Sequence, residues 1–269
     1  MLLKLIVGLI LLYFAVAAAL YFAQTSIFFP TRLVPPGGPL PQGAETVELT
    51  APDGVRLEGV LIPPSVAYGS GTVILGFAGN ASNAAGIAEF LHGLYPGHAV
   101  VAFHYRGYRP SAGTPDAAAL VADAPLIHDW VRLRLRPERL VVVGISIGSG
   151  VAAGVASQRP LDGLILVTPF DSLKAVARQQ FPWLPVGLLL RHDLPSDIYL
   201  SGSDVPVAIV AAEHDEVVPP ERTRALAAAV PRLVHNALIP GTRHNDIAGS
   251  PLFFLEMRRA LEAVLRARN

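Results

Sequence analysis

The stretch from Leu140 to Ala153 reads Leu-Val-Val-Val-Gly-Ile-Ser-Ile-Gly-Ser-Gly-Val-Ala-Ala, and it decides the fold of the chain. Its first four residues are apolar, which is typical of a short strand buried on both faces. A G-x-S-x-G motif follows and leads into a run of small residues that suits a helix. The pattern predicts a sharp turn between strand and helix with Ser146 at its tip. Glycine suits positions 144 and 148 because a Cβ there would crowd the turn.

Short apolar runs of the same kind recur on both sides of this motif. They predict strands at residues 72–77, 99–103, 140–143, 164–167 and 207–211, with a strand-like pair at 238–239. Amphipathic stretches predict helices at 83–94, 116–135, 149–157 and 221–230, and another at the C-terminus. A hairpin at 46–50 and 55–62 comes first. Strands that alternate with helices predict an α/β fold, a mainly parallel twisted sheet with helices on both faces.

The overall composition limits the class of protein. The 269 residues include 21 Lys and Arg and 21 Asp and Glu, so the net charge is +0 and a nucleic-acid binder is disfavoured. Hydrophobic residues make up 52% of the chain, which excludes intrinsic disorder. The chain has no cysteine. Disulfides, Cys-ligated zinc, iron–sulfur clusters and a thiol nucleophile are therefore excluded.

The N-terminal segment predicts a membrane anchor over residues 1–25. No charged side chain occurs from Leu5 to Ala23, and about 19 residues of helix span about 28 Å, close to the bilayer core. The alternative is a cleaved signal peptide with Ala17-Ala18-Ala19 at its cleavage site. Lys4 before the span favours a cytoplasmic N-terminus, which would place the rest of the chain outside the cytoplasm. Residues 26–45, rich in Pro and Gly, predict a linker to a domain over 46–269.

Ser146 needs a base and an acid before it can act as a nucleophile, because a serine hydroxyl is weak alone. In this kind of fold the chain order is Ser, then acid, then His. Asp215 follows the predicted strand 207–211, with Glu213 and Glu216 as rivals. His244 follows the last predicted strand, with His214 as its rival. The sequence therefore predicts a catalytic triad of Ser146, Asp215 and His244.

An oxyanion hole requires backbone N–H donors beside the nucleophile. The N–H of Ile147, directly after Ser146, is one candidate. The second is expected from the small-residue loop after strand 72–77, where Asn80 is the candidate donor and Ala78 and Gly79 are its neighbours. An ordinary loop in which Asn83 caps the next helix fits the same residues.

The chain resembles the α/β-hydrolase superfamily in its membrane-anchored serine-hydrolase branch, which includes depalmitoylases, lysophospholipid lipases and serine-aminopeptidase-like hydrolases. The likeness runs from about residue 27 onward. The matching blocks are 77–81 (Phe-Ala-Gly-Asn-Ala), 105–108 (Tyr-Arg-Gly-Tyr), 144–148, 168–173 (Thr-Pro-Phe-Asp-Ser-Leu), 215–219 (Asp-Glu-Val-Val-Pro) and 244–246 (His-Asn-Asp). Three positions depart from the family pattern: Ala78 replaces a usual His, His104 a common Asp, and Arg109 a usual Gly. The resemblance implies the triad argued above and no metal or organic cofactor.

Residues 171–203 interrupt the alternation of strand and helix and predict a small cap insertion. The apolar, proline-broken stretch 181–190 fits either a lid or pocket wall for an acyl chain, or a helix that faces the core. Together these features predict a membrane-tethered hydrolase of carboxylic esters or thioesters, with small-molecule or acyl-lipid substrates. An amidase or peptidase using the same triad, and a non-catalytic binding scaffold at the membrane, are the alternatives.

Overall fold

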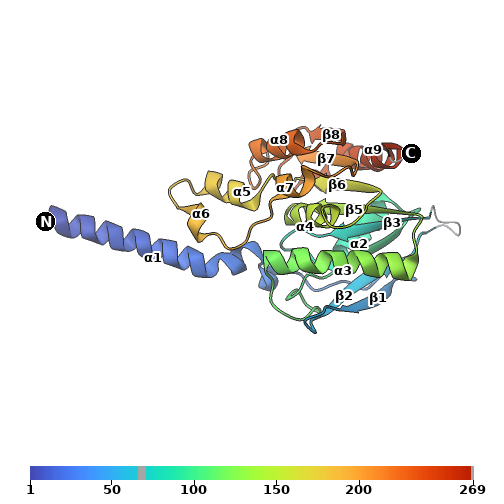
Figure 1. Cartoon of the computed structure of the whole chain (residues 1–269), viewed down its shortest axis with the longest axis horizontal. Coiled ribbons are helices and arrows are strands. Elements are labelled where there is room, and N and C mark those ends of the chain that lie inside the picture. The colour runs from blue at the N-terminus through green and yellow to red at the C-terminus, as the bar shows by residue number, and fades with distance from the viewer. Residues whose placement is uncertain (66–70, 268–269) are drawn as a thin grey trace.

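The computed structural model describes residues 1–65 and 71–267, and its centre is one eight-stranded sheet (Figure 1). The strand order is β1-β2-β4-β3-β5-β6-β7-β8. From β4 onward neighbouring strands are parallel, whereas β2 is antiparallel to both β1 and β4. The strands are β1 (Glu45–Thr50), β2 (Arg56–Ile62), β3 (Thr72–Phe77), β4 (Ala99–Phe103), β5 (Arg139–Ile145), β6 (Gly163–Val167), β7 (Val207–Ala212) and β8 (Leu233–Ile239). The predicted fold class is confirmed.

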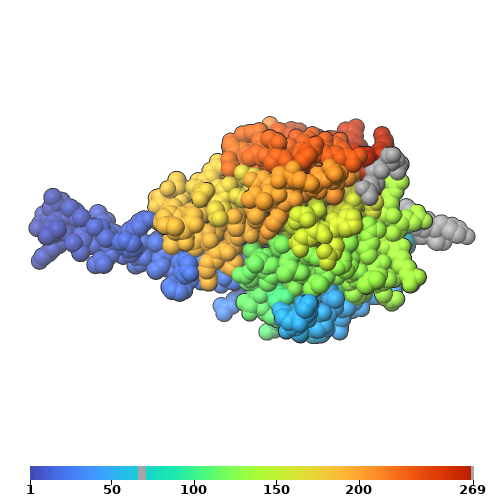
Figure 2. Space-filling model, viewed as in Figure 1, coloured from blue at the N-terminus to red at the C-terminus, as the bar shows by residue number. Residues whose placement is uncertain are grey.

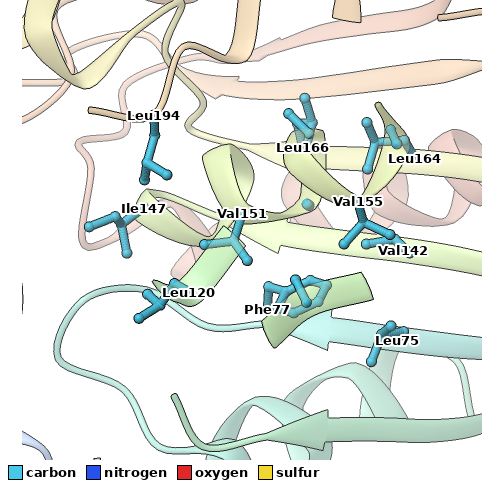
Figure 3. Packing of buried hydrophobic residues seen from close by; sticks show 14 of the residues in the cluster. Leu75, Phe77, Leu120, Val142, Ile147, Val151, Val155, Leu164, Leu166 and Leu194 are labelled. Carbon is cyan, nitrogen blue, oxygen red and sulfur yellow. The ribbon is translucent and has the colours of Figure 1, made fainter. Parts of the chain in front are cut away.

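Helices cover both faces of this sheet. One face packs against α2 (Ala84–Leu94) and α9 (Pro251–Ala267), and the other against α3 (Ala117–Leu135), α4 (Ile147–Ala156) and α8 (Pro220–Ala229). The central strands are apolar throughout because both of their faces are buried. Figure 3 shows Leu75, Phe77 and Val142 of the sheet packed against Val151 and Val155 of α4. This packing places α4, and the turn that precedes it, in the middle of the molecule.

The predicted elements differ from the structure mainly at their ends. Asn83 and Asp116 are the N-caps of α2 and α3, where their side chains accept backbone N–H groups at 2.7 to 3.3 Å. The largest difference is β8, which starts at Leu233 although only 238–239 reads as a strand. His235 and Asn236 interrupt its apolar pattern. At this edge of the sheet Asn236 is exposed, and His235 Nε2 lies 3.0 Å from Glu256 Oε2 of α9.

Two features depart from the alternation of strand and helix. The N-terminal helix α1 (Leu2–Phe28) projects from the layered body, as Figure 2 shows, and is long and apolar enough to cross a membrane. A short 3-10 helix, Thr31–Leu33, follows it. The segment between β6 and β7 forms the short helices α5 (Leu173–Gln180), α6 (Val186–Leu189) and α7 (Ser196–Leu200).

Candidate active site

Ser146 lies at the tip of the turn between β5 and α4, in a backbone conformation that few side chains adopt. Its φ is 53° and its ψ is −120°. The turn is tight because a Cβ on Gly144 would lie 2.5 Å from the Gly148 carbonyl oxygen. The Ser146 N–H donates to the Val167 carbonyl oxygen at 2.9 Å, which ties the turn to the end of β6. Strained backbone of this kind exposes the serine hydroxyl beyond the carboxyl ends of the strands.

A hydrogen-bonded chain of side chains connects Ser146 to His244 and Asp215. The Ser146 Oγ lies 2.9 Å from His244 Nε2. His244 Nδ1 lies 2.8 Å from Asp215 Oδ2 and 2.9 Å from Oδ1. The Asp215 carboxylate also accepts the N–H groups of Val217 and Val218 at 3.0 and 2.7 Å. Because the carboxylate accepts from Nδ1–H, the facing Nε2 is free to accept the serine proton.

The rival side chains have other partners. Glu213 accepts the N–H of Gly241 at 2.8 Å, and Glu216 Oε2 lies 3.4 Å from the backbone N of His244. His214 is 64% exposed in its side chain, with Nε2 3.5 Å from the Glu213 carboxylate. The tertiary structure thus brings together the three residues that the chain order predicts. Glu213 and His214 lie against other groups, and Glu216 contacts the backbone of His244 rather than its imidazole.

The loop after β3 lies against the nucleophile. A Cβ built on Gly79 would lie 3.9 Å from the Ser146 Cβ. Gly79 and Asn80 line the same cavity as Ser146, whereas Ala78 is buried at the end of β3. Ile147 is the first residue of α4, so its N–H lies outside the helical ladder of hydrogen bonds. The predicted oxyanion donors therefore lie on two adjoining segments beside Ser146.

Two buried tyrosines determine the orientation of that loop. Tyr105 Oη donates to the Ala78 carbonyl oxygen at 2.8 Å, and Tyr108 Oη donates to the Asn80 carbonyl oxygen at 2.6 Å. The two bonds hold the carbonyl groups of Ala78 and Asn80 pointing toward the tyrosines. The sequence did not predict this role for the Tyr-Arg-Gly-Tyr block. The one feature that pointed to it is the position of the block just after strand β4, where functional residues collect in such sheets.

The cavity at Ser146 has a volume of about 620 Å³ and a mixed lining. Apolar walls come from α2 and from the segment after His244, and polar side chains come from the two loops. The lining includes Ile87, Phe90, Ile247, Ala248, Asn80, Ser82, Asn83 and Asn245. Among the described residues that line it, none is Lys, Arg, Asp or Glu, and none comes from 171–203. The cavity therefore suits an uncharged group beside an apolar chain.

Comparison with known proteins places this geometry in a family. The family model described as alpha/beta hydrolase fold matches residues 73–198, which contain Ser146 and the loop after β3. A Mycobacterium tuberculosis H37Rv protein, described as uncharacterized protein Rv2307c, is 37% identical over 227 residues, which are 82% of this chain and 79% of the relative. The chain belongs to the α/β-hydrolase superfamily.

Two of the proteins that this chain resembles carry activities in their names. Lysophosphatidylserine lipase ABHD12 of Danio rerio is 31% identical over 141 residues, which are 46% of this α/β hydrolase and 37% of the lipase. The structure of the Pyrococcus furiosus esterase Pf2001 superposes with a TM-score of 0.66 at 19% identity, covering 87% of this chain and 98% of the esterase. The second likeness concerns the fold alone. Hydrolase is the enzyme class that this membership indicates.

The departure of this α/β hydrolase from the family pattern at His104 has a structural account. Its Nδ1 accepts the N–H of Ala84, the first residue of α2, at 3.3 Å. Burial lowers the pKa of the imidazole to about 4 because the charged form loses its hydration. His104 is therefore a neutral acceptor that completes the start of α2, and α2 is one wall of the cavity.

Proposed function

We propose that this chain is a serine hydrolase that cleaves carboxylic esters or thioesters of acyl chains. The observation that carries the proposal is the continuous chain from Ser146 Oγ through the His244 imidazole to the Asp215 carboxylate. That arrangement supplies a nucleophile, a base and a group that orients the base. The uncharged cavity beside it, with apolar side chains from α2, suits an acyl chain.

The mechanism follows from the positions of these atoms. Ser146 Oγ attacks the acyl carbon while His244 Nε2 takes its proton, and Asp215 stabilises the imidazolium that results. The N–H groups of Ile147 and Asn80 donate to the oxygen that becomes negative, each contributing about 3–4 kcal/mol. The alcohol or thiol leaves with the proton from His244. Water, deprotonated by His244, then cleaves the acyl-Ser146 bond and releases the carboxylic acid.

Labelling with a fluorophosphonate probe tests the nucleophile. The native chain should react at Ser146, and Ser146→Ala should fold normally but lose the label. Ser82→Ala is the matched control, because Ser82 lines the same cavity and should leave labelling unchanged. Undiminished labelling of Ser146→Ala would refute the assignment, and a native chain that neither reacts nor hydrolyses activated esters would support the binding scaffold instead.

Turnover of paired substrates tests the bond that is cleaved. The native chain should hydrolyse p-nitrophenyl esters and acyl thioesters faster than aminoacyl anilides. Ser146→Ala should hydrolyse none of them. Faster turnover of the anilides would identify an amidase or peptidase with the same triad.

The N-terminal helix extends the proposal to location. We propose that α1 is a single membrane anchor with the catalytic domain outside the cytoplasm. Gln24, near the end of α1, is only 5% exposed and is built into contacts with the rest of the chain, which supports retention of the segment that contains it. Reporter enzymes that need an extracytoplasmic location, fused to the C-terminus, should be active. Activity only from a cytoplasmic reporter would reverse the orientation.

A further inference from the structure

The segment 181–192 lies beside α1 (Figure 1), and hydrogen bonds join the two at Gln24 and at Tyr13. Gln24 makes the central contact, since its side-chain amide donates to the Leu189 carbonyl oxygen at 3.2 Å and accepts the Arg191 N–H at 2.7 Å. About 16 Å closer to the N-terminus of the helix, Tyr13 Oη donates to the Trp183 carbonyl oxygen at 3.3 Å. The segment is therefore attached to α1 at two distant levels.

Helix length then limits where this segment lies relative to a membrane. The part of α1 from Leu2 to Tyr13 has about 12 residues and is about 18 Å long, whereas a bilayer core is about 30 Å thick. α1 can cross the membrane only if residues well beyond Tyr13 are also inside it. Because Trp183 lies beside Tyr13, the attached segment enters the membrane region together with α1.

The composition of residues 181–190 fits that location. The sequence Phe-Pro-Trp-Leu-Pro-Val-Gly-Leu-Leu-Leu carries no charge. Phe181, Trp183 and Leu188 are 42%, 50% and 87% exposed, which is unfavourable in water and favourable in lipid. Arg178 and Arg191 flank it in the sequence. The Arg191 guanidinium lies 4.9 Å from the centre of the Tyr21 ring of α1, and the Arg178 guanidinium lies against Gly187; both side chains are long enough to bring their charge to lipid headgroups.

The backbone of this segment also fits a medium without water. An unpaired N–H in hydrocarbon costs several kcal/mol, so irregular backbone is normally excluded from lipid. Pro182 and Pro185 have no N–H. Hydrogen bonds within the chain satisfy the N–H groups of Phe181, Leu184, Val186, Leu188, Leu189 and Leu190. Eight of these ten residues therefore present no free donor.

We propose that residues 181–190 insert into the lipid bilayer beside α1, so that two elements, α1 and this segment, hold the hydrolase domain at the membrane surface. The exposed apolar side chains of 181–190 contact the lipid of the bilayer, because the segment adjoins the candidate membrane-spanning helix and has no charged residue of its own.

This position adjoins the candidate active site. Gln180, directly before the inserted segment, donates its side-chain amide to the carbonyl oxygens of Glu216 and Val217, both at 3.3 Å. Val217 lines the Ser146 cavity, and so does Pro35, seven positions after the end of α1. If the function proposed above holds, the cavity takes acyl chains that arrive from the bilayer rather than from water.

Trp183 is a natural reporter of insertion, since the chain has only two tryptophans. Trp130→Phe leaves Trp183 alone, and Trp183→Phe leaves Trp130, which packs on Phe103 in the body of the domain. The full chain would be reconstituted in vesicles of phosphatidylcholine and phosphatidylglycerol. Chain-brominated phosphatidylcholine should quench Trp183 but not Trp130. Quenching of Trp183 by aqueous iodide but not by brominated lipid would overturn the proposal.

Single cysteines give an independent measure of depth because the chain has none of its own. Leu188→Cys and Leu133→Cys replace leucines that are 87% and 78% exposed, so neither substitution disturbs the core. A nitroxide at 188 should be accessible to oxygen and protected from an aqueous nickel chelate, and one at 133, on α3, should show the opposite. Equal exposure of both sites to the chelate would refute insertion.

An activity measurement separates this proposal from the proposed function. Leu188→Asp should slow hydrolysis of an acyl ester held in vesicles and leave a water-soluble ester unaffected. Equal rates for Leu188→Asp and the native chain on the vesicle ester would contradict delivery from the bilayer. A chain without esterase activity would refute the function but leave the depth measurements to decide insertion.

Discussion

Gly148 lies so close to Phe77 that a Cβ at position 148 would be 2.3 Å from the Phe77 carbonyl oxygen. The start of α4 and the end of β3 therefore touch through their backbones. This contact sets the position of the Ser146 turn relative to the loop that follows Phe77, which carries one of the proposed oxyanion donors. Side-chain packing alone would leave more freedom between the two segments.

Gly148→Ala should destabilise the fold by about 1–3 kcal/mol, because the added methyl meets backbone that cannot move aside. The accompanying displacement of the loop should lower kcat on p-nitrophenyl esters by about 100-fold. Gly93→Ala is the control, since Gly93 lies in helix α2 with nothing within 4 Å, and it should be neutral or slightly stabilising. Urea unfolding and steady-state kinetics measure both effects. A Gly148→Ala chain of native stability and rate would refute the argument.

Asp215→Asn should lower kcat by about 10⁴-fold, because the amide no longer stabilises the imidazolium or enforces the correct tautomer of His244. Glu213→Gln, which keeps an acceptor for the Gly241 N–H, should retain native kinetics. Glu216→Gln should also retain them within a few-fold. Ester hydrolysis by the purified variants measures the ranking. If Glu213→Gln or Glu216→Gln were the slow variant, the acid would be misassigned.

Tyr108→Phe should reduce kcat more than it reduces stability. Loss of its bond to the Asn80 carbonyl oxygen costs about 1 kcal/mol of folding free energy but frees the loop beside Ser146. Tyr95→Phe is the matched control, because Tyr95 Oη donates to the Met257 carbonyl oxygen at 2.8 Å away from the cavity. Both variants should lose similar stability in thermal unfolding, and only Tyr108→Phe should lose activity. Equal kinetics would show that the tyrosine is merely structural.

His104 should make the fold sensitive to mild acid. Its pKa is lowered by burial to about 4, so between the ordinary pKa near 6.5 and that value the unfolded chain binds a proton that the folded chain does not. His104 therefore costs the fold no stability above about pH 6.5. As the pH drops below that value, the free energy of unfolding decreases by about 1.4 kcal/mol per pH unit, and about 3 kcal/mol is lost near pH 4.

His104→Gln provides the comparison, because glutamine keeps an acceptor for the Ala84 N–H and does not titrate in this range. Urea unfolding of both chains at pH 7 and pH 4.5 should show the smaller loss of stability in His104→Gln. Parallel losses would mean that another group causes the acid sensitivity.

Local patterns in the sequence predicted much of the fold. The apolar runs at 72–77, 140–143 and 207–211 predicted central strands, because a strand buried on both faces has no polar position. The glycines at 144 and 148 predicted the strained turn, since backbone sterics act over a few neighbouring residues. β8 was mostly missed, because His235 and Asn236 on an edge strand break the apolar pattern on which such predictions depend.

The chain order of serine, acid and histidine, together with the loop after β3, singled out the candidate residues of the site. The sequence left Asp215 open against Glu213 and Glu216, and it left His244 open against His214. These choices depend on the conformation of the loops after β7 and β8, where the N–H groups of Val217 and Val218 hold the Asp215 carboxylate beside the His244 imidazole.

The sequence by itself determined the central strands of the sheet, the turn at Ser146 and an N-terminal helix apolar enough for a membrane, because sterics and hydrophobic periodicity are local properties. Only the tertiary structure decided that His244 meets Ser146 across 98 positions at 2.9 Å, that Tyr105 and Tyr108 orient the loop after β3, and that Gln24 joins α1 to the segment 181–192. Such contacts depend on how distant segments pack, and no local pattern encodes a distance between residues that meet only after the sheet has formed.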